Sequence, residues 1–370
     1  MSVKPSAAYT LKDQDAKDPA LLMPTVHVIV TPPQGGILRT PLGMDPLVLG
    51  TSGECDVILA DAKVSRRHCE LRLTPRGIAL RDLGSKNGTI VGEVQILEVI
   101  LPLGVPVSLG NSRLVAHLEG APAVVPLHER GRFGDALGES VPMRALFARL
   151  ERAAGAPETV VLIGEPGTGK EILARGVHAA GPRQDGPFQV LRCGGVAPAL
   201  IKRELFGADG AVQGADGAGL FEQARGGTLL IDDLGELPLE LQPRLLAALD
   251  ARAGGAPAPR VVGGTRRSLR GRLAEGSLRE DLHRRLAVHE VRVPALRDRR
   301  GDIPVLVEHF LGLRSPPRRI EDLPPNTMEM LTSHDWPGNV RELRSTVARL
   351  AVFAELPGGR SPQVHSAEEA

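Results

Sequence analysis

Hydrophobic residues in the first third of the chain come in short runs, such as VHVIV (26–30) and CELRL (69–73), separated by turn residues. The turns recur at short, fairly regular intervals, and no helical period is sustained between them. Several short strands with frequent turns are typical of a β-sandwich. We therefore expect an all-β sandwich at residues 25–118, preceded by a disordered arm at residues 1–24.

The pattern changes from Phe133 onward. Helical patterns such as MRALFARLERAA (143–154) alternate there with apolar runs such as TVVLIG (159–164). Such alternation predicts a parallel sheet wrapped by helices, the α/β class. We therefore expect a multidomain chain in which an α/β core and a small helical domain follow the β-sandwich. The expected boundaries are a linker at residues 119–132, a core at residues 133–302, a helical domain at residues 303–355 and a tail at residues 356–370.

Composition and charge exclude some classes of protein. The chain of 370 residues has a formal net charge of +1, so it lacks the overall basic excess of many nucleic-acid-binding proteins. Its three cysteines are widely spaced, which favours neither a zinc site nor a disulfide framework and fits a reduced compartment. The polar N-terminus and the lack of a long apolar run in the sequence predict neither a signal peptide nor a membrane span. We expect a cytoplasmic protein.

One stretch, TVVLIGEPGTGKEILARGVH (159–178), joins an apolar run, a glycine-rich loop, a lysine and a helical pattern. This order predicts a P-loop, because glycines let backbone N–H groups converge on phosphate oxygens at the start of a helix. Lys170 would reach the outer phosphates, while Glu171 stands where a P-loop usually carries the Ser or Thr that binds magnesium. The residues expected to hold the nucleotide here are Gly164, Glu165, Gly167, Thr168, Gly169, Lys170 and Glu171.

The P-loop and five further blocks give the chain, from about Phe133 to Phe353, a resemblance to the bacterial sigma-54-dependent activators of the AAA+ ATPase superfamily. The resemblance implies an α/β AAA+ core with a small helical lid. It also implies ATP and Mg²⁺ as cofactors, assembly into a homo- or hetero-oligomeric ring, and sigma-54 RNA polymerase as a partner. The five blocks are ELFG (204–207), FEQARGGTLLIDDLGELPLELQPRLL (221–246), LREDLHRRLAV (278–288), VPALRDRRGDI (293–303) and WPGNVRELR (336–344).

The same resemblance assigns roles to residues outside the P-loop. Asp232 would orient magnesium, and Arg341 would sense the γ-phosphate. Arg279 and Arg285 match arginines that reach the nucleotide of a neighbouring subunit, where a cation stabilises the transferring phosphoryl group. Asp233 occupies the position of a glutamate that polarises the attacking water. Because its side chain is one methylene shorter, we expect slower hydrolysis.

Two further positions depart from the resemblance. Arg192 stands where the family has an asparagine that holds the catalytic glutamate in a switchable pose, and a fixed cation there would pair with a carboxylate instead of releasing it. Arg266 replaces a second asparagine, which contacts the γ-phosphate and the water. One hypothesis is that the domain binds ATP through Lys170 but hydrolyses it slowly or not at all. The alternative is that the two arginines compensate for each other and turnover survives, which leaves ATPase activity open.

The segment GAVQGA (210–215) matches the sigma-54 contact loop of the family, GAFTGA. The hinge glycines remain, but the aromatic residue is replaced by Val212, which loses ring area, and the threonine is replaced by Gln213. The stretch DARAGGAPAP (250–259) is also shorter than the hairpin that relatives carry beside this loop. We therefore expect weak or absent remodelling of sigma-54 polymerase.

Two motifs in the sandwich, SRRH and DLGSKNGT, resemble those of forkhead-associated (FHA) domains, which read phosphothreonine. The resemblance implies that Ser65 donates its hydroxyl to the phosphate and that Asn87 holds the peptide backbone. Arg66 and Lys86 can add charge, since a phosphate carries close to two negative charges. Thr51 replaces an arginine of the family, which removes one bidentate phosphate contact. The expected partner is a phosphothreonine protein, and the alternative is a sandwich used only for protein packing.

The stretch 260–301 contains twelve arginines against five acidic residues, which by itself hints at nucleic-acid binding. We attribute the excess to the arginines that act in trans and to surface pairs. Residues 355–370 are too few for a helix-turn-helix, so we expect no direct sequence-specific DNA binding. Two functions remain. One is a transcription regulator in which phospho-signals read by the FHA domain gate an ATP-driven oligomer that acts on sigma-54 polymerase. The other is a largely inactive nucleotide-binding adaptor or dominant-negative partner of active paralogues.

Overall fold

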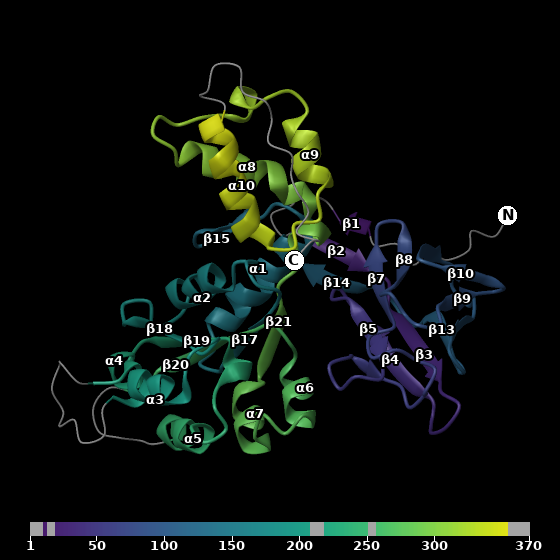
Figure 1. Cartoon of the computed structure of the whole chain (residues 1–370), viewed down its shortest axis with the longest axis horizontal. Coiled ribbons are helices and arrows are strands. Elements are labelled where there is room, and N and C mark those ends of the chain that lie inside the picture. Colours follow the sequence, from purple (N-terminus) through teal and green to yellow (C-terminus); the bar gives the residue numbers. More distant parts are fainter. Residues whose placement is uncertain (1–9, 13–18, 208–217, 251–256, 354–370) are drawn as a thin grey trace. The chain divides into compact units, whose positions relative to one another are not determined.

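The computed structural model describes residues 10–12, 19–207, 218–250 and 257–353. The residues separate into two units. One unit comprises residues 1–129 with residues 267–283, and the other comprises residues 130–266 with residues 284–370. Each unit is described by itself below, with the strands and helices labelled as in Figure 1.

The two larger β-sheets of the N-terminal unit form the expected all-β sandwich. Neighbouring strands pair antiparallel in both sheets, except that β5 and β6 pair in parallel. The six-stranded sheet has the order β10 (Val94–Ile96), β9 (Thr89–Val91), β12 (Val107–Leu109), β13 (Ser112–Leu118), β3 (Val26–Thr31) and β4 (Leu38–Leu42). The five-stranded sheet has the order β11 (Glu98–Leu101), β8 (Gly77–Asp82), β7 (Cys69–Thr74), β5 (Leu47–Gly50) and β6 (Val57–Ile58).

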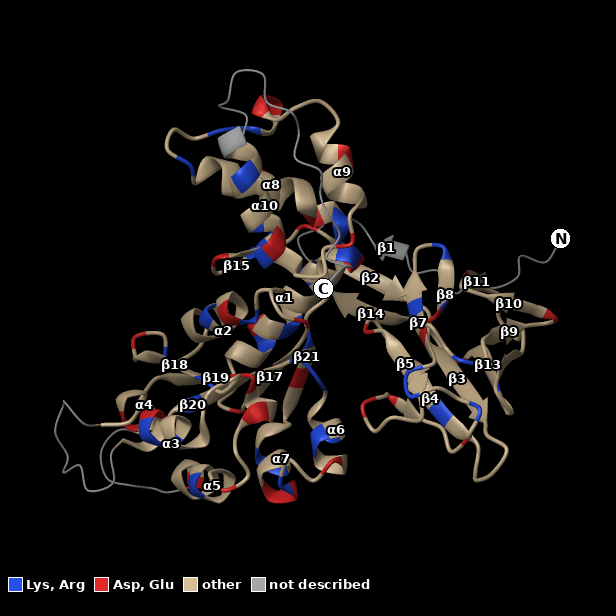
Figure 2. Cartoon of the chain, viewed as in Figure 1, with Lys and Arg blue, Asp and Glu red and all other residues tan. Residues whose placement is uncertain are grey.

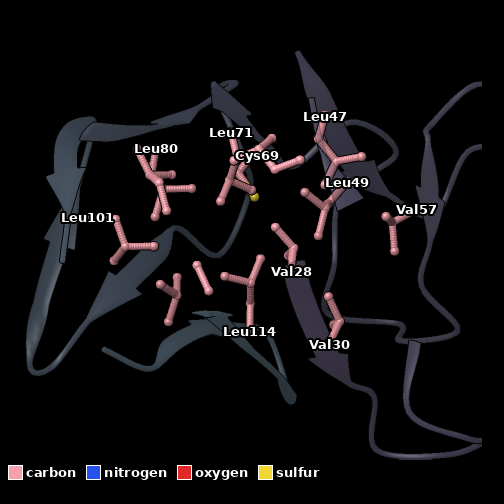
Figure 3. Packing of buried hydrophobic residues seen from close by; sticks show 14 of the residues in the cluster. Val28, Val30, Leu47, Leu49, Val57, Cys69, Leu71, Leu80, Leu101 and Leu114 are labelled. Carbon is pink, nitrogen blue, oxygen red and sulfur yellow. The ribbon is translucent and has the colours of Figure 1, made fainter. Parts of the chain in front are cut away.

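The core of this unit consists of aliphatic side chains from both sheets. In β3, Val26, Val28 and Val30 are buried while the residues between them are half-buried, as expected for a strand with one face inside. Figure 3 shows Val28 and Leu114 of one sheet gathered with Leu49 and Leu71 of the other. Each fully buried Val or Leu contributes about 1.5–3 kcal/mol relative to an exposed one. A core poor in aromatic residues is therefore sufficient for this sandwich.

The structure differs from the expected disordered arm and linker. The described part of the arm contains β1 (Thr10–Lys12) and β2 (Ala20–Met23), and the linker contains β14 (Ala123–Pro126). These strands form a three-stranded antiparallel sheet in which β2 is central. Leu21 of β2 is fully buried. The four-residue run ALLM is the apolar part of an otherwise polar arm, and it becomes a strand because a second short apolar run, AVVP, pairs with it.

The sheet of the C-terminal unit has five parallel strands, which confirms the expected α/β class. Their order is β18 (Phe188–Arg192), β19 (Thr228–Asp232), β20 (Arg260–Thr265), β17 (Val160–Ile163) and β21 (His289–Arg292). The onward connections of the neighbouring strands β17 and β20 run in opposite directions, from β17 to β18 at one edge of the sheet and from β20 to β21 at the other. In open α/β sheets, ligands bind beyond the carboxyl ends of the strands at such a reversal. The loop after β17 is the predicted P-loop.

Helices lie on both sides of this sheet (Figure 1). Helix α1 has a proline in its first turn, which suits a helix start because the missing N–H has no partner there in any case. Apolar residues of α1 and α2 form one core with β17, β19, β20 and β21. The helices of this unit in the order of the chain are α1 (Val141–Ala154), α2 (Lys170–Ala179), α3 (Pro198–Phe206), α4 (Leu220–Gln223) and α5 (Gln242–Asp250). Helix α6 (Leu269–Ala274) belongs to the segment grouped with the N-terminal unit, and the boundary of that segment falls within α7 (Glu280–Leu286).

The C-terminal residues of the described chain form the expected helical domain, whose helices pack around the buried Trp336. The indole N–H of Trp336 donates a hydrogen bond to the carbonyl of Leu331 at 2.7 Å. The helices are α8 (Ile303–Gly312), α9 (Thr327–Ser333) and α10 (Asn339–Phe353). Within the described residues, no helix combines the length and the apolar character that crossing a membrane requires.

Charged residues of both signs are mixed on the helices of the α/β unit, for example on α2 and α3 (Figure 2). Arginines of the stretch 260–301 have partners that explain their presence without nucleic acid. Arg260 is buried and donates to the carbonyls of Ala153 and Ala154 at the end of α1. Arg299 is also buried and donates to the carbonyl of Thr168. These two buried arginines account for part of the excess through backbone contacts, in addition to the expected trans-acting arginines and surface pairs.

Candidate functional site

The P-loop connects the end of β17 to the start of α2, as predicted. The Gly164 amide donates to the Thr265 carbonyl at the end of the neighbouring strand β20, at 2.9 Å. Gly167 and Gly169 have φ angles of +78° and +102°, which side chains rarely adopt. Gly169 directly precedes α2 and offers no side chain as a cap, so the free N–H groups at the start of α2 face the loop. This is the backbone arrangement that binds phosphate groups.

Lys170 is the first residue of α2 and is only 8% exposed. Its Nζ donates to the carbonyls of Gly164 and Glu165, at 2.8 and 3.0 Å. Burial lowers the pKa of Lys170 below its usual value, while the negative charges of Asp232 and Asp233 act in the opposite direction. The ammonium group therefore lies at the P-loop and close to the two carboxylates, where it can contact the outer phosphates of a nucleotide.

Asp232 and Asp233 stand at the carboxyl end of β19, as expected. Asp233 has a φ of +53°, a left-handed conformation that costs a non-glycine residue of the order of 1 kcal/mol or more. Its amide donates to Oδ1 of Asp232 at 3.1 Å. A Cβ atom placed on Gly194 would lie 2.3 Å from Oδ2 of Asp233, so the carboxylate occupies the space that this glycine leaves. The strained backbone thus sends the Asp233 side chain away from the line of the strand.

Arg266 binds the Asp233 carboxylate with two donors. Nε donates to Oδ1 at 3.1 Å and Nη2 to Oδ2 at 3.2 Å, which is the bidentate geometry of strong arginine–carboxylate pairs. The hydrogen bond and the charge of Asp233 raise the pKa of Arg266. The Asp233 side chain is 18% exposed and that of Arg266 is 60% exposed, so solvent screens the pair in part. Both oxygens of the Asp233 carboxylate are therefore engaged by one cation.

Arg192 pairs with the carboxylate of Glu171, whereas Asp233 is paired with Arg266. Nη2 of Arg192 lies 3.3 Å from Oε2 of Glu171, whose Oε1 accepts from Arg175 at 2.9 Å. The hydrogen bond from Arg175, together with the charge of Arg192, holds the pKa of Glu171 below its usual value. Arg192 ends β18 opposite Asp232 of β19, while Asp233 lies beyond the strand in its left-handed turn. Arg192 and Arg266, the two residues that depart from the family, therefore contact different carboxylates.

The residues at this site fit a magnesium ion held mainly by nucleotide phosphates. Magnesium in nucleotide sites keeps several waters and takes one or two carboxylates from the protein. Asp232 can supply such a carboxylate, whereas Glu171 is engaged by two arginines. Within the described residues, no group of three or more His, Cys, Asp or Glu side chains could hold a metal ion without such phosphates.

The two arginines expected to act in trans are bound to acidic residues of this chain. Arg279 directs Nε and Nη2 to the Asp281 carboxylate, with an Nη2–Oδ2 distance of 2.7 Å. Arg285 donates from Nε to Oδ1 of Asp250 at 3.2 Å. Both side chains are more than 40% exposed. A single chain does not test their role toward a neighbouring subunit, which stays a prediction.

The lid brings Arg341 to the P-loop, together with residues that sequence reasoning missed. The amide of Arg341 lies 3.3 Å from the Gly167 carbonyl. Asn339, Arg297 and Arg299 also donate to P-loop atoms. They lie within the blocks WPGNVRELR and VPALRDRRGDI, which carry the resemblance to the family. The sequence of these blocks does not indicate that they contact the P-loop.

The predicted phosphopeptide residues of the sandwich come together at the loops between its strands. Oγ of Ser65 accepts a hydrogen bond from the Lys86 amide at 2.9 Å, and Nδ2 of Asn87 donates to the Lys63 carbonyl at 2.7 Å. The Ser65 hydroxyl thus keeps its own proton for another acceptor. Arg66 uses its backbone carbonyl to accept from the Ser52 amide.

His68 lies beneath these loops and is fully buried. Its Nδ1 accepts from the Ser65 amide at 3.1 Å, and its Nε2 lies 3.2 Å from the Gly88 carbonyl. Burial lowers the pKa of His68, which favours the neutral ring that can accept at one nitrogen and donate at the other. Thr51 adjoins the same loops, since its amide donates to the Ser65 carbonyl. The segments that carry the two sequence motifs are therefore joined by one buried histidine.

The loop expected to contact sigma-54 lies outside the part of the chain that the structure describes. Residues 210–215, with Val212 and Gln213, lie outside the described residues, as does most of the shortened stretch 250–259. The tail at residues 356–370 lies outside them as well.

Three family models match the chain. The Sigma-54 interaction domain matches residues 136–292, and the AAA+ ATPase lid domain matches residues 297–360. The FHA domain matches residues 47–110. The matched residues include the P-loop and the carboxyl ends of β19 and β20 in the first model, and both phosphopeptide motifs in the third.

Curated proteins resemble the C-terminal part of the chain. The transcriptional regulator NtrC of Salmonella typhimurium is 39% identical over 267 residues, covering 66% of this chain and 57% of that protein. NtrC of Azospirillum brasilense is 42% identical over 231 residues, covering 59% and 48%. The transcriptional activator HyfR of Escherichia coli is 40% identical over 245 residues, covering 63% and 36%. The chain thus spans roughly a third to just over half of the length of these relatives.

Solved structures of NtrX from Brucella abortus resemble the same part. The complex with ATP has a TM-score of 0.53 and 36% sequence identity, covering 63% of this chain and 55% of that one. The complex with ADP has the same TM-score and 35% identity, covering 61% and 53%.

Proposed function

Because the chain contains a Sigma-54 interaction domain, an AAA+ ATPase lid domain and an FHA domain, we propose that it is an ATP-binding transcription regulator of the sigma-54 activator type that hydrolyses ATP slowly or not at all. Recognition of phosphothreonine by the FHA domain would control the AAA+ domain. The observation that carries the slow hydrolysis is the bidentate pair between Arg266 and Asp233.

Nucleotide binding is supported by the P-loop and by the relatives. The left-handed glycines, the start of α2 and the buried Lys170 supply donors and positive charge for phosphate groups. NtrX, which is similar over the same part of the chain, has been crystallised with ATP and with ADP. Magnesium bound to the phosphates would offset charge that develops on them, and Asp232 is the residue that would hold it.

Slow hydrolysis follows from what Arg266 does to Asp233. A general base must accept a proton from water, and the Arg266 guanidinium already donates a hydrogen bond to each oxygen of the Asp233 carboxylate, so a water must compete with it for them. A carboxylate that is held by another donor contributes less to proton transfer, and proton transfer by a general base is worth about 10²- to 10⁴-fold in typical enzymes. Asp233 is also shorter than the glutamate of the family, which adds a positional cost.

The FHA domain is proposed to bind a phosphothreonine protein through Ser65, Arg66, Lys86 and Asn87. Ser65 and the Lys86 amide are adjacent, and the loops that carry these residues are held by the buried His68. Contact with sigma-54 is proposed to be weak, since Val212 and Gln213 replace the aromatic residue and the threonine of the contact loop. Robust open-complex formation by the full chain in a reconstituted transcription assay would contradict this part.

A second candidate function is favoured by the same Arg266–Asp233 pair. A chain that binds ATP without hydrolysing it can act as an adaptor, or as an inactive subunit in rings with active paralogues. The exposed Arg279 and Arg285 remain available to reach a neighbour's nucleotide when they leave their own acidic partners. The two candidates differ in whether the chain by itself forms an ATP-dependent oligomer with any turnover.

The experiment measures ATP affinity, phosphate release and particle size on the full chain, with NtrC of Salmonella typhimurium as the active reference. We expect ATP binding with phosphate release at least tenfold slower than that of the reference, since the general base is impaired. Release at the rate of the reference would overturn slow hydrolysis, and undetectable ATP binding would overturn the nucleotide site. Growth of the particle on adding ATP favours the regulator, while an unchanged size favours the adaptor.

The FHA proposal is tested on the same protein by titration with a phosphothreonine peptide library and its unphosphorylated counterpart. We expect heat of binding only with the phosphorylated peptides, and a loss of affinity of roughly tenfold in Ser65→Ala, because a hydrogen bond to a charged group is worth about 1.5–3 kcal/mol. Equal binding of both peptide sets would indicate a sandwich used for packing alone.

A further inference from the structure

The P-loop is held from outside by the two chain segments that enter the lid. Both oxygens of the Glu165 carboxylate are engaged there. Arg297 donates to both of them, with Nη1 at 2.9 Å from Oε2, and Nδ2 of Asn339 donates to Oε2 at 3.0 Å. Glu165 is the second residue of the P-loop, and its side chain is 40% exposed. It therefore binds lid residues rather than pointing only into solvent.

Asn339 joins three segments with one side chain. Its Oδ1 accepts from the Leu296 amide at 2.8 Å, and its Nδ2 also donates to the Pro166 carbonyl at 3.1 Å. It is fully buried and begins α10. Asn339 and Trp336 have φ angles of +54° and +51°. A non-glycine residue keeps such a conformation only where the surrounding contacts hold it, and the bonds of Asn339 are such contacts.

The start of α10 also contacts the P-loop through the backbone. The amides of Val340 and Arg341 lie 3.0 and 3.3 Å from the Gly167 carbonyl. A Cβ atom on Gly167 would lie 2.2 Å from the Gly338 carbonyl oxygen and 3.1 Å from Cβ of Arg341. Arg341 is therefore fixed beside the P-loop at its backbone and its Cβ, and its charge is among those that Lys170 experiences.

We infer that Glu165, Arg297 and Asn339 form a latch that positions Arg341 at the P-loop and thereby increases the preference of the site for ATP over ADP. The inference rests on the proposed nucleotide-binding function. A cation beside the loop attracts a triphosphate more than a diphosphate because the triphosphate carries more negative charge. Arg341 has this effect only while α10 stays against Gly167, and the three latch residues hold it there. They are positioning residues, since the structure gives them contacts to the loop and the lid.

The test is a double-mutant cycle on the full chain, with ATP and ADP affinities measured by calorimetry. Glu165→Gln and Arg297→Gln remove the charge pair, while Arg341→Ala removes the positioned cation. We expect each latch variant to weaken ATP binding about threefold to tenfold and ADP binding less, which lies in the lower part of the range of coupling between contacting residues. In combination with Arg341→Ala, the latch variants should cause no further loss of the ATP-to-ADP preference, because the group that they position is already absent.

Asp335→Asn is the matched control. It breaks the lid pair between Arg300 and Asp335, which does not include the P-loop, and should leave the preference unchanged. Latch effects that add to that of Arg341→Ala, or latch variants with an unchanged ATP-to-ADP ratio, would overturn the inference alone. A wild-type chain that binds neither nucleotide would overturn the proposed function and the inference with it. Asn339→Ala is a poorer probe because its side chain is fully buried.

Discussion

The two sides of the candidate nucleotide site differ in the groups that form them. On the side that grips phosphate, backbone groups and the buried Lys170 form the P-loop, and lid residues brace it from outside. On the side where water would react, the acidic side chains Asp233 and Glu171 are paired with exposed arginines. Backbone geometry survives most substitutions, whereas a reacting carboxylate is sensitive to a single neighbouring charge. Binding and hydrolysis can therefore be lost separately in this fold.

Removal of Lys170 from the phosphate-binding side should have the largest effect on the nucleotide site. In Lys170→Ala, we expect ATP affinity to fall by at least about 30-fold, because losing one partner of a buried charge interaction costs about 2–5 kcal/mol. Calorimetry on the full chain measures this, and Lys202→Ala on α3 is the matched control. Unchanged affinity in Lys170→Ala would mean that the P-loop does not grip the nucleotide, and the comparison of the two sides would fail.

Returning positions 233 and 266 to the residues of the family should have the next largest effect. In Asp233→Glu combined with Arg266→Asn, the carboxylate reaches further and loses its bidentate partner, so we expect turnover to rise about tenfold to 100-fold. ATP affinity should change little, because Lys170 and the glycines are untouched. Steady-state phosphate release measures the rate, and Arg344→Asn on the surface of α10 controls for the loss of an arginine. If turnover did not rise, the cause of slow hydrolysis would lie elsewhere in the site.

Arg192→Asn should have the smallest effect. Glu171 keeps its hydrogen bond to Arg175, and an exposed ion pair contributes about 0–1 kcal/mol. We expect less than about 1 kcal/mol of stability to be lost at pH 7, as measured by urea unfolding. The folded-state pKa of Glu171 is held low, so the contribution of its pairs is present above the unfolded-state pKa and is lost as the pH falls through the folded-state value. The variant and the wild type should therefore converge in acid, and a larger loss at low pH would contradict this assignment.

Much of the architecture could be predicted from the sequence. The sandwich, the α/β core and the helical lid follow from short runs, alternating elements and blocks that are contiguous in the chain. The arm and the linker could not be predicted as strands. ALLM and AVVP are each four residues long, too short to indicate strands, and they pair across about 100 residues of sequence.

The sequence by itself determined that the chain has a P-loop, since strand, glycines, lysine and helix follow one another and fold locally. It also determined which polar residues differ from the family around the water position. Only the tertiary structure decided which arginine binds which acid. Arg192, Asp233 and Arg266 stand at the ends of three different strands, and the order and register of the sheet bring these ends together. The contact of Asn339 with Glu165 likewise joins residues 174 positions apart. Such pairings depend on how separate elements pack, and no local pattern of residues carries that information.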